Sequence, residues 1–220
     1  MSIDIRNTGF ISYEDAYEIQ KKKHEELLEN KRKGKECEGV VYFCEHPHVF
    51  TIGKSGDRSN LLVNEGRLKS EGIKCLRVDR GGDITYHGPG QSVVYPVLDL
   101  DVFGWGAKDY IYFLEYSVIS VLKYYGIKGE VIEGKPGVWL DAGGVNERKI
   151  CAAGVKISMG ITMHGIALNV NTDLSYFGYI NPCGFADKGV TSIRNELGKP
   201  VDMNILNMRL KDEFLNRLTV

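Results

Sequence analysis

Residues 80–91 read RGGDITYHGPGQ, and the apolar, β-branched run SVVYPVL at 92–98 follows directly. The twelve residues include four glycines and a proline, and few of the others are side chains that a hydrophobic core usually takes. Gly81 and Gly82 let the backbone approach a ligand closely, and residues 88–90 form a tight turn. The composition therefore predicts a loop at a binding or active site that leads into a buried strand.

A glycine-rich hairpin is the structural alternative for this stretch. A hairpin accounts for the glycines but gives no reason for the polar and aromatic side chains between them. These are Arg80, Asp83, Tyr86 and His87. A functional site is the better interpretation.

Hydrophobic periodicity elsewhere predicts three helices and a run of strands. Helices are expected at 12–32, 107–125 and 202–218, where apolar residues recur at intervals of three and four. Strands are expected at 39–44, 49–52, 74–78, 83–86, 92–98, 129–132, 138–141, 149–158 and 160–169, the last two forming a hairpin. Because few helices separate the strands, we expect an α+β fold with a mixed, mainly antiparallel sheet and packed helices.

Length and composition favour one domain and exclude several functional classes. With 220 residues, 43% of them hydrophobic, and no linker or repeat, a single domain at 1–220 is expected. The formal net charge of -1 gives no electrostatic footprint for nucleic acid. The absence of a long apolar run or an apolar signal segment predicts a cytoplasmic protein that does not act on membranes.

The five cysteines are scattered along the chain. They are Cys37, Cys44, Cys75, Cys151 and Cys183. An odd number without CxxC spacing favours reduced thiols over a disulfide framework. Cys44, His46 and His48 alternate as zinc ligands can, but a proline interrupts their strand and no fourth ligand is spaced nearby, so no metal is expected.

Cys183 is the cysteine whose surroundings suggest chemistry. It lies in the turn sequence Asn181-Pro182-Cys183-Gly184, where the glycine leaves one side of the sulfur open. A lone cysteine is more often buried and inert than nucleophilic. The turn alone therefore leaves both interpretations open.

Six segments together resemble the octanoyltransferases of lipoate synthesis. They are HPHVFTIGK at 46–54, RGGDITYHGPGQ at 80–91, PGVW at 136–139, RKICAAGVK at 148–156, HGIALNV at 164–170 and NPCG at 181–184. The segments occur in the family's order, and the resemblance extends from the first helix to about residue 195. Lipoate and biotin protein ligases share the fold but lack the HGPGQ ending and the NPCG cysteine. The resemblance implies a lipoate/biotin protein ligase-like fold.

The resemblance also implies an activity and its partners. An octanoyl group would move from octanoyl-acyl carrier protein to a specific lysine of a lipoyl domain, without ATP or another cofactor. The family's acceptors are lipoyl domains of 2-oxoacid dehydrogenase E2 subunits and the glycine cleavage H protein. In the family the cysteine matched by Cys183 carries the acyl thioester, and the lysine matched by Lys149 favours the thiolate and relays protons. Without the resemblance, Lys149 would be interpreted as a solvated lysine.

Fourteen residues match family segments that line the acyl channel and the thioester carbonyl. They are Arg80, Gly81, Gly82, Asp83, Ile84, Thr85, Tyr86, His87, Ala152, Ala153, Gly154, Gly165, Ile166 and Ala167. Small side chains there leave room for a linear chain, and exposed backbone N–H groups would stabilise an oxyanion. His87 and His164 are interpreted either as orienting groups or as structural histidines.

Two other functions are considered on the same residues. One is an ATP-dependent lipoate or biotin protein ligase, and the other is a non-catalytic acyl-binding thiol protein. A basic stretch along the first helix is either a docking face for an acidic carrier protein or an ordinary solvated face. Its residues are Lys21, Lys22, Lys23, Lys31, Arg32, Lys33 and Lys35.

Overall fold

The structure is a computed structural model that describes residues 2–36, 38–181 and 189–218. Its α-helices are α1 (Tyr13–Arg32), α2 (Glu65–Ser70), α3 (Ala107–Tyr124), α4 (Ile193–Leu197) and α5 (Met203–Leu218). The main sheet contains β1 (Ile3–Phe10), β2 (Gly39–Glu45), β6 (Gln91–Val97), β7 (Glu130–Ile132), β8 (Lys135–Leu140), β9 (Arg148–Ser158), β10 (Ile161–Asn169) and β11 (Gly189–Val190). A smaller sheet contains β3 (Val49–Ile52), β4 (Lys74–Arg77) and β5 (Ile84–His87). The short 3-10 helices are η1 (Arg58–Asn60), η2 (Leu100–Phe103) and η3 (Leu174–Tyr179).

Most strand pairs in both sheets are antiparallel. The main sheet has the order β1-β2-β6-β10-β9-β8-β7, with β11 beside β9, and the smaller sheet has the order β4-β3-β5. Parallel pairing is confined to β1 with β2, β11 with β9 and β3 with β4. The predicted α+β class with a mixed, mainly antiparallel sheet is confirmed.

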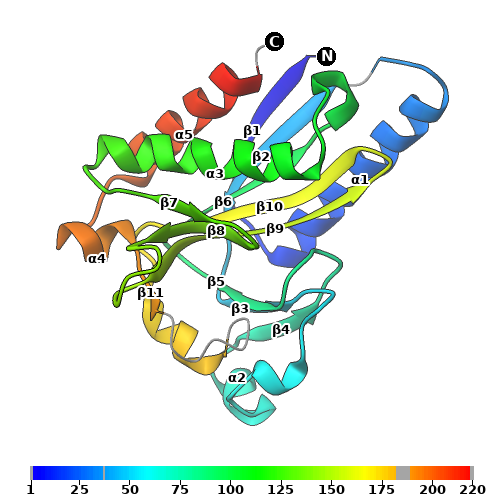
Figure 1. Cartoon of the computed structure of the whole chain (residues 1–220). Coiled ribbons are helices and arrows are strands. Elements are labelled where there is room, and N and C mark those ends of the chain that lie inside the picture. The colour runs from blue at the N-terminus through cyan, green and yellow to red at the C-terminus, as the bar shows by residue number, and fades with distance from the viewer. Residues whose placement is uncertain (1, 37, 182–188, 219–220) are drawn as a thin grey trace.

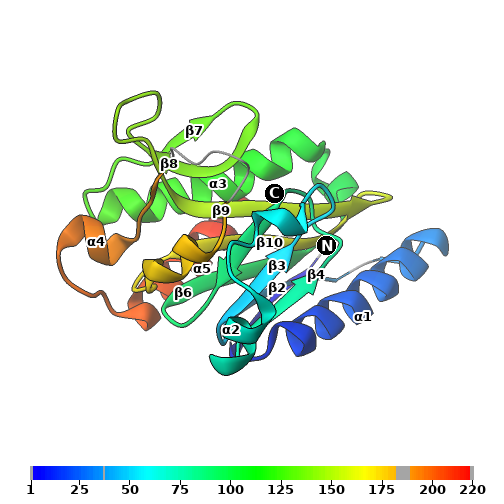
Figure 2. The ribbon, with the colours of Figure 1, turned by 90° about the horizontal axis from the view of Figure 1, so that it is seen from below.

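Both faces of the main sheet are covered (Figure 1). Helices α3 and α5 pack on one face through a large apolar cluster, and α1 packs on the other face, against β6 and β10. The smaller sheet lies on the same side as α1, as the view from below also shows (Figure 2). Among the helices of the described ranges, none combines the length and apolar character needed to cross a membrane.

The three long predicted helices are confirmed within a residue or two at each end. Ser12 caps α1 by accepting a hydrogen bond from the Asp15 backbone N–H at 3.1 Å, which satisfies a donor that the first turn leaves open. Gly126, with a φ of 72°, stops the chain from continuing α3. The predicted β9–β10 hairpin is also confirmed, because Met159 and Gly160 have φ values of 50° and 79°, as a tight two-residue turn requires.

Strand β1 was not predicted. Its sequence IDIRNTGF is half polar, and β1 lies at the edge of the main sheet, where β2 is its one partner among the described strands. An edge strand needs less apolar surface than a central one, so the pattern in the sequence is weak.

The expectation that residues 80–91 contain almost nothing buried is wrong. Arg80, Ile84, Tyr86, His87 and Gln91 are each at most 7% exposed. The reason is that this stretch crosses from one sheet to the other, with β5 paired to β3 and β6 paired to β2 and β10. It is therefore not a hairpin, and both sheets cover it.

Gly165 gives a test of how closely the central strands pack. A Cβ added to this residue of β10 would lie 2.1 Å from the Val94 carbonyl oxygen of β6, so the backbone would have to move. We expect Gly165→Ala to lower the free energy of unfolding by about 2 kcal/mol in urea titrations. Gly178→Ala is the matched control, because no heavy atom lies within 4 Å of its added Cβ. Equal stability of the two variants would contradict this packing.

Candidate active site

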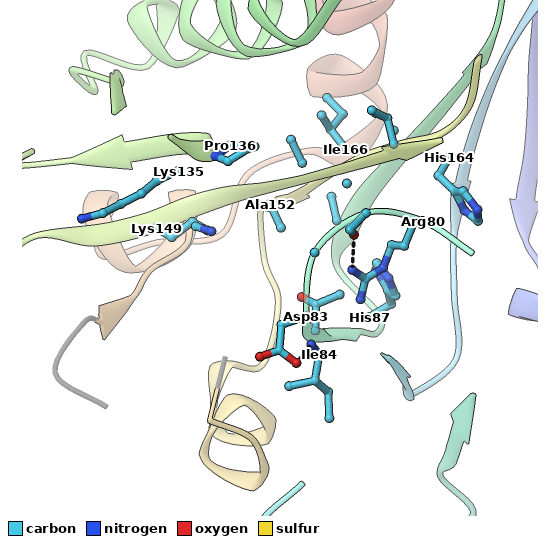
Figure 3. Close-up of a pocket in the computed structure, with 18 of the residues that line it drawn as sticks. Arg80, Asp83, Ile84, His87, Lys135, Pro136, Lys149, Ala152, His164 and Ile166 are labelled. Carbon is cyan, nitrogen blue, oxygen red and sulfur yellow. Dashed lines mark hydrogen bonds between the residues drawn. The ribbon is translucent and has the colours of Figure 1, made fainter. Parts of the chain in front are cut away.

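A cavity of about 660 Å³ lies where β9 and β10 face the segment at 80–87 (Figure 3). Lys149 lines it, as do all fourteen residues predicted to bind substrate except Tyr86. The structure therefore brings together segments that are far apart in the sequence. Tyr13, Gln91, Tyr95, Trp139 and Asn169 also line the cavity, although they were not among the predicted substrate-binding residues.

Tyr86 lies off the cavity, in the core of the smaller sheet. Its side chain is fully buried, its ring stacks on Tyr176 at 5.1 Å between centroids, and its hydroxyl lies 2.7 Å from His48 Nδ1. Side chains alternate along a strand, so Tyr86 faces away from the neighbours that line the cavity. A Cβ at Gly88 would lie 1.9 Å from the Tyr86 hydroxyl, so this glycine makes room for the tyrosine.

A β-bulge turns Lys149 towards the cavity. Val138 pairs with Cys151 and Trp139 pairs with Lys149, which leaves Ile150 as an extra residue in β9. Ile150 and Cys151 are consecutive, yet both lie in the apolar cluster beneath α3 and α5. Regular alternation would place Lys149 on the same face as Cys151, and the extra residue moves it to the opposite face.

The Lys149 ammonium has an aromatic neighbour on the cavity side. Its Nζ lies 4.5 Å from the centroid of the Trp139 ring, a cation–π geometry that holds the ammonium in one position. On the other edge of β9, Val190 of β11 pairs with Lys149 and Gly189 pairs with Arg148. Strand β11 therefore lies directly beside Lys149.

Cys183, the predicted nucleophile, lies outside the described residues. The three cysteines that the structure describes are free thiols, and none has the character of a nucleophile. Burial raises the pKa of Cys44, Cys75 and Cys151, so the reactive thiolate is disfavoured at each of them.

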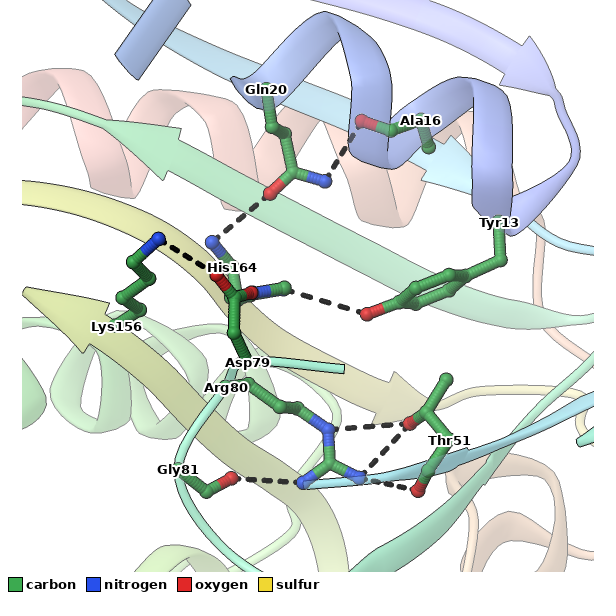
Figure 4. A network of polar contacts seen from close by, with 9 residues as sticks. All are labelled: Tyr13, Ala16, Gln20, Thr51, Asp79, Arg80, Gly81, Lys156 and His164. Atoms are coloured by element: carbon green, nitrogen blue, oxygen red, sulfur yellow. Dashed lines mark hydrogen bonds and ion pairs between the residues drawn. The ribbon is translucent and has the colours of Figure 1, made fainter. Parts of the chain in front are cut away.

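A chain of hydrogen bonds fixes Arg80 in the cavity wall (Figure 4). Its guanidinium donates to the Thr51 hydroxyl and carbonyl and to the Gly81 carbonyl, at 2.7–3.2 Å. The Thr51 hydroxyl in turn lies 3.4 Å from His87 Nε2. On the far side of the ring, His87 Nδ1 lies 2.8 Å from Gln91 Oε1.

The same chain determines the state of His87. Gln91 donates its amide nitrogen to Tyr86 and Asn169, so its Oε1 is the acceptor that faces His87 Nδ1. Burial lowers the pKa of His87 well below its ordinary value, so the ring is neutral near pH 7 and carries its proton on Nδ1. His87 is therefore a neutral part of the wall and connects the two sheets.

A second network surrounds His164, whose φ is 61° (Figure 4). Its Nε2 donates to Asp79 Oδ1 at 2.8 Å, and its backbone N–H donates to the Gln20 side chain at 3.0 Å. Lys156 Nζ donates to the other oxygen of Asp79 at 2.7 Å. Because a carboxylate only accepts, Nδ1 of the neutral ring is left to accept from the Tyr13 hydroxyl, 3.4 Å away.

The charge in this network rests on Asp79 and Lys156. Burial lowers the pKa of His164, although its Asp79 partner opposes this. The hydrogen bond from His164, with that from Lys156, holds the pKa of Asp79 well below its ordinary value. Through Asp79, which directly precedes Arg80, the network connects the cavity wall to α1, β9 and β10. The sequence offered one clue, since Asp79 directly precedes the RGG motif.

Some of the backbone N–H groups in the predicted site take part in the hydrogen bonds of the main sheet. Ile166 and Ala167 lie in β10, which pairs with β6 on one edge and with β9 on the other. Backbone N–H groups of a strand flanked on both edges belong to the sheet ladders. The backbone N–H groups of Ile166 and Ala167 are therefore not available to an oxyanion, whereas the small side chains beside them leave space for a ligand.

Within the described ranges, no three His, Cys, Asp or Glu side chains are grouped as metal ligands. His46 donates from Nδ1 to the Ile11 carbonyl at 2.8 Å, and its Nε2 lies 2.8 Å from the Tyr95 hydroxyl. His48 is turned away towards Tyr86. Cys44 Sγ lies 3.6 Å from His46 Nε2, but His48 belongs to a separate contact, so the three side chains do not converge on one point.

The basic stretch on α1 is partly neutralised. Lys31 Nζ lies 2.6 Å from carboxylate oxygens of both Asp99 and Asp101. Lys23 and Lys33 also pair with glutamates of the same helix. These pairs fit the solvated-face interpretation, and docking at this stretch stays a prediction.

Comparisons with known proteins show the family of the chain. The family model described as lipoyl protein ligase A/B catalytic domain matches residues 17–215. The octanoyltransferase of Parabacteroides distasonis is 51% identical over 215 residues, 97% of each chain. The octanoyltransferase of Bacteroides fragilis is 50% identical over 208 residues, 94% of each chain. A bipartite lipoate protein ligase structure from Thermoplasma acidophilum shares the fold, with a TM-score of 0.70, 17% identity, and coverage of 99% of this chain and 84% of that one.

The Asp79 network predicts a pH-dependent stability. Folding lowers the pKa of Asp79, so its ionised form stabilises the folded state above about pH 4, and this contribution is lost as the pH falls further. We expect Asp79→Asn to lower the free energy of unfolding by about 2 kcal/mol at pH 7 and by much less near pH 2. Urea titrations at both pH values measure this. Asp4→Asn, which removes an exposed partner of Arg6, should change little, and a pH-independent deficit in Asp79→Asn would contradict the assignment.

Proposed function

Because the chain belongs to the lipoyl protein ligase A/B catalytic domain family, we propose that it transfers an octanoyl group to protein in lipoate biosynthesis. The observation that carries this proposal is about 50% identity, over nearly the whole length, to relatives named octanoyltransferase. The site supports it independently. A cavity with small residues on the neighbouring strands β9 and β10 suits a linear acyl chain, and Lys149 lines its wall.

The donor in this proposal is octanoyl-acyl carrier protein, and Cys183 is the acceptor of the first step. The Cys183 thiolate attacks the carbonyl carbon of the thioester, and the bond from that carbon to the carrier sulfur breaks. Lys149, as an ammonium, gives the departing carrier thiolate its proton. The products of this step are free carrier protein and an octanoyl thioester on Cys183.

The second step moves the octanoyl group to a lysine amine. The amine attacks the thioester carbon, neutral Lys149 accepts a proton from the attacking nitrogen, and the Cys183 thiolate departs. The product is an amide, and the enzyme returns to its starting state. Because a thioester is converted to an amide, the sequence of steps runs downhill without ATP. We propose lipoyl domains of 2-oxoacid dehydrogenase E2 subunits and the glycine cleavage H protein as acceptors, and the cytoplasm as the location.

Mass spectrometry tests the thioester. We expect incubation with octanoyl-acyl carrier protein to add one octanoyl group to Cys183, and Cys183→Ala to abolish both this adduct and turnover. Cys75→Ser is the matched control, since Cys75 is a half-buried thiol whose pKa is raised, and it should retain activity. An adduct at Cys75 or Cys151 would contradict the assignment. Turnover that requires ATP would support a ligase instead, and an adduct without release to a lipoyl domain would support a non-catalytic acyl-binding protein.

The pH dependence of alkylation tests Lys149. An adjacent ammonium favours the thiolate, so we expect Lys149→Met to shift the alkylation profile of Cys183 to higher pH and to lower the transfer rate on the order of 100-fold. Lys149→Arg should keep the alkylation profile but not the transfer rate, because arginine retains its proton near neutral pH. Identical alkylation profiles for wild type and Lys149→Met would remove Lys149 from this role.

A further inference from the structure

Glu115 of α3 is a buried carboxyl group that the proposed mechanism does not yet use. It is 1% exposed and lies at the interface between α3 and the main sheet. Its Oε1 accepts a hydrogen bond from the Gly137 backbone N–H at 2.8 Å. Its Oε2 is buried and has no hydrogen-bond partner among the described residues. A buried carboxyl with one unsatisfied oxygen is costly, and such an exception calls for a reason.

The position of Glu115 connects it to the cavity. One helical turn earlier on the same face of α3, Ile111 lines the cavity. Gly137, the hydrogen-bond partner, follows the cavity-lining Pro136 in β8. Two residues further along β8, Trp139 pairs with Lys149. Glu115 therefore contacts the strand segment that supports Lys149.

The charges around Glu115 are few. Burial raises the pKa of its carboxyl, whereas the Gly137 N–H and the positive charge of Lys149 oppose this increase. The other titratable group that responds to Glu115 is Cys151, also on β9. Its pKa is raised by burial, so it stays a neutral thiol. Lys135, at the start of β8, is directed to Glu147 at 3.5 Å. Among the described residues, Lys149 is a cation whose charge acts on Glu115.

We propose that Glu115 is a positioning residue for Lys149: its carboxylate holds the Gly137 segment of β8 in place and keeps Lys149 in the ammonium form. The inference rests on the proposed octanoyl transfer, in which that ammonium favours the Cys183 thiolate. Glu115 touches no substrate in this proposal and acts only through Lys149.

Competitive acetylation of lysines, read by peptide mass spectrometry across a pH series, measures the apparent pKa of Lys149 directly. We expect Glu115→Gln to lower that pKa by about one pH unit, because an opposite charge is removed while the acceptor for the Gly137 N–H remains. Glu133→Gln is the matched control, since it removes a carboxylate from the exposed pair with Lys108 and should leave Lys149 unchanged. An unaltered pKa of Lys149 in Glu115→Gln would overturn the proposal.

Carbon-13 NMR of glutamate carboxyl groups in wild type gives a test that does not depend on a variant. The proposal requires the Glu115 carboxyl to be ionised between pH 6 and 8, and a protonated Glu115 across that range would also overturn it. Both measurements report on Glu115 and Lys149 even if the protein transfers no octanoyl group, so the two proposals can fail separately. Where transfer occurs, Glu115→Gln should slow thioester formation about tenfold at pH 7 and leave the KM for the carrier protein unchanged, and the rate should recover at higher pH.

Discussion

One extra residue in β9, relative to its neighbour β8, determines what the cavity wall can do. Ile150 has no partner in β8, so the residues of β9 that precede it point to the opposite face from the one that regular alternation would give them. Lys149 then stands over the Trp139 ring on the cavity side, whereas Ile150 and Cys151 both enter the apolar core. The chemistry of the cavity wall depends on this irregularity, because a regular strand would bury Lys149 beneath α3 and remove its ammonium from the cavity.

Neutral polar side chains hold the remaining wall in place. Arg80 is fixed through Thr51 and His87, and His87 is fixed through Gln91 to the opposite strand. Burial keeps His87 uncharged, so its ring donates a hydrogen bond from Nδ1 to Gln91 and has no proton on Nε2. Such a network, fully satisfied, makes a rigid wall, which suits a site where a thioester carbon must stay close to two reacting groups in turn.

The sequence predicted what depends on local patterns and missed what depends on pairing. Helices α1 and α3 and the β9–β10 hairpin follow from periodicity, a cap and a two-residue turn. The bulge could not be predicted, because an extra residue is defined only against the partner strand. Tyr86 was placed at the site by its motif, but its position in β5 turns it into the core. Asp79 and Glu115 become visible as members of the site only once β10 and α3 are placed beside them.

Glycine residues allow the segment at 80–82 to approach the main sheet closely at the cavity. Gly154 of β9 pairs with Gly165 of β10, and a Cβ on Gly154 would lie 3.1 Å from the Gly81 carbonyl oxygen. The loop that carries Arg80 therefore rests almost directly on the backbone of the main sheet. Beside this contact, Ala152 and Ala167 leave the space that larger side chains would fill. The glycines let the two backbones pack closely at the cavity wall, and the alanines beside them leave space for an acyl chain. The segment at 80–91, which resembles a flexible loop in the sequence, is therefore a closely packed boundary in the fold.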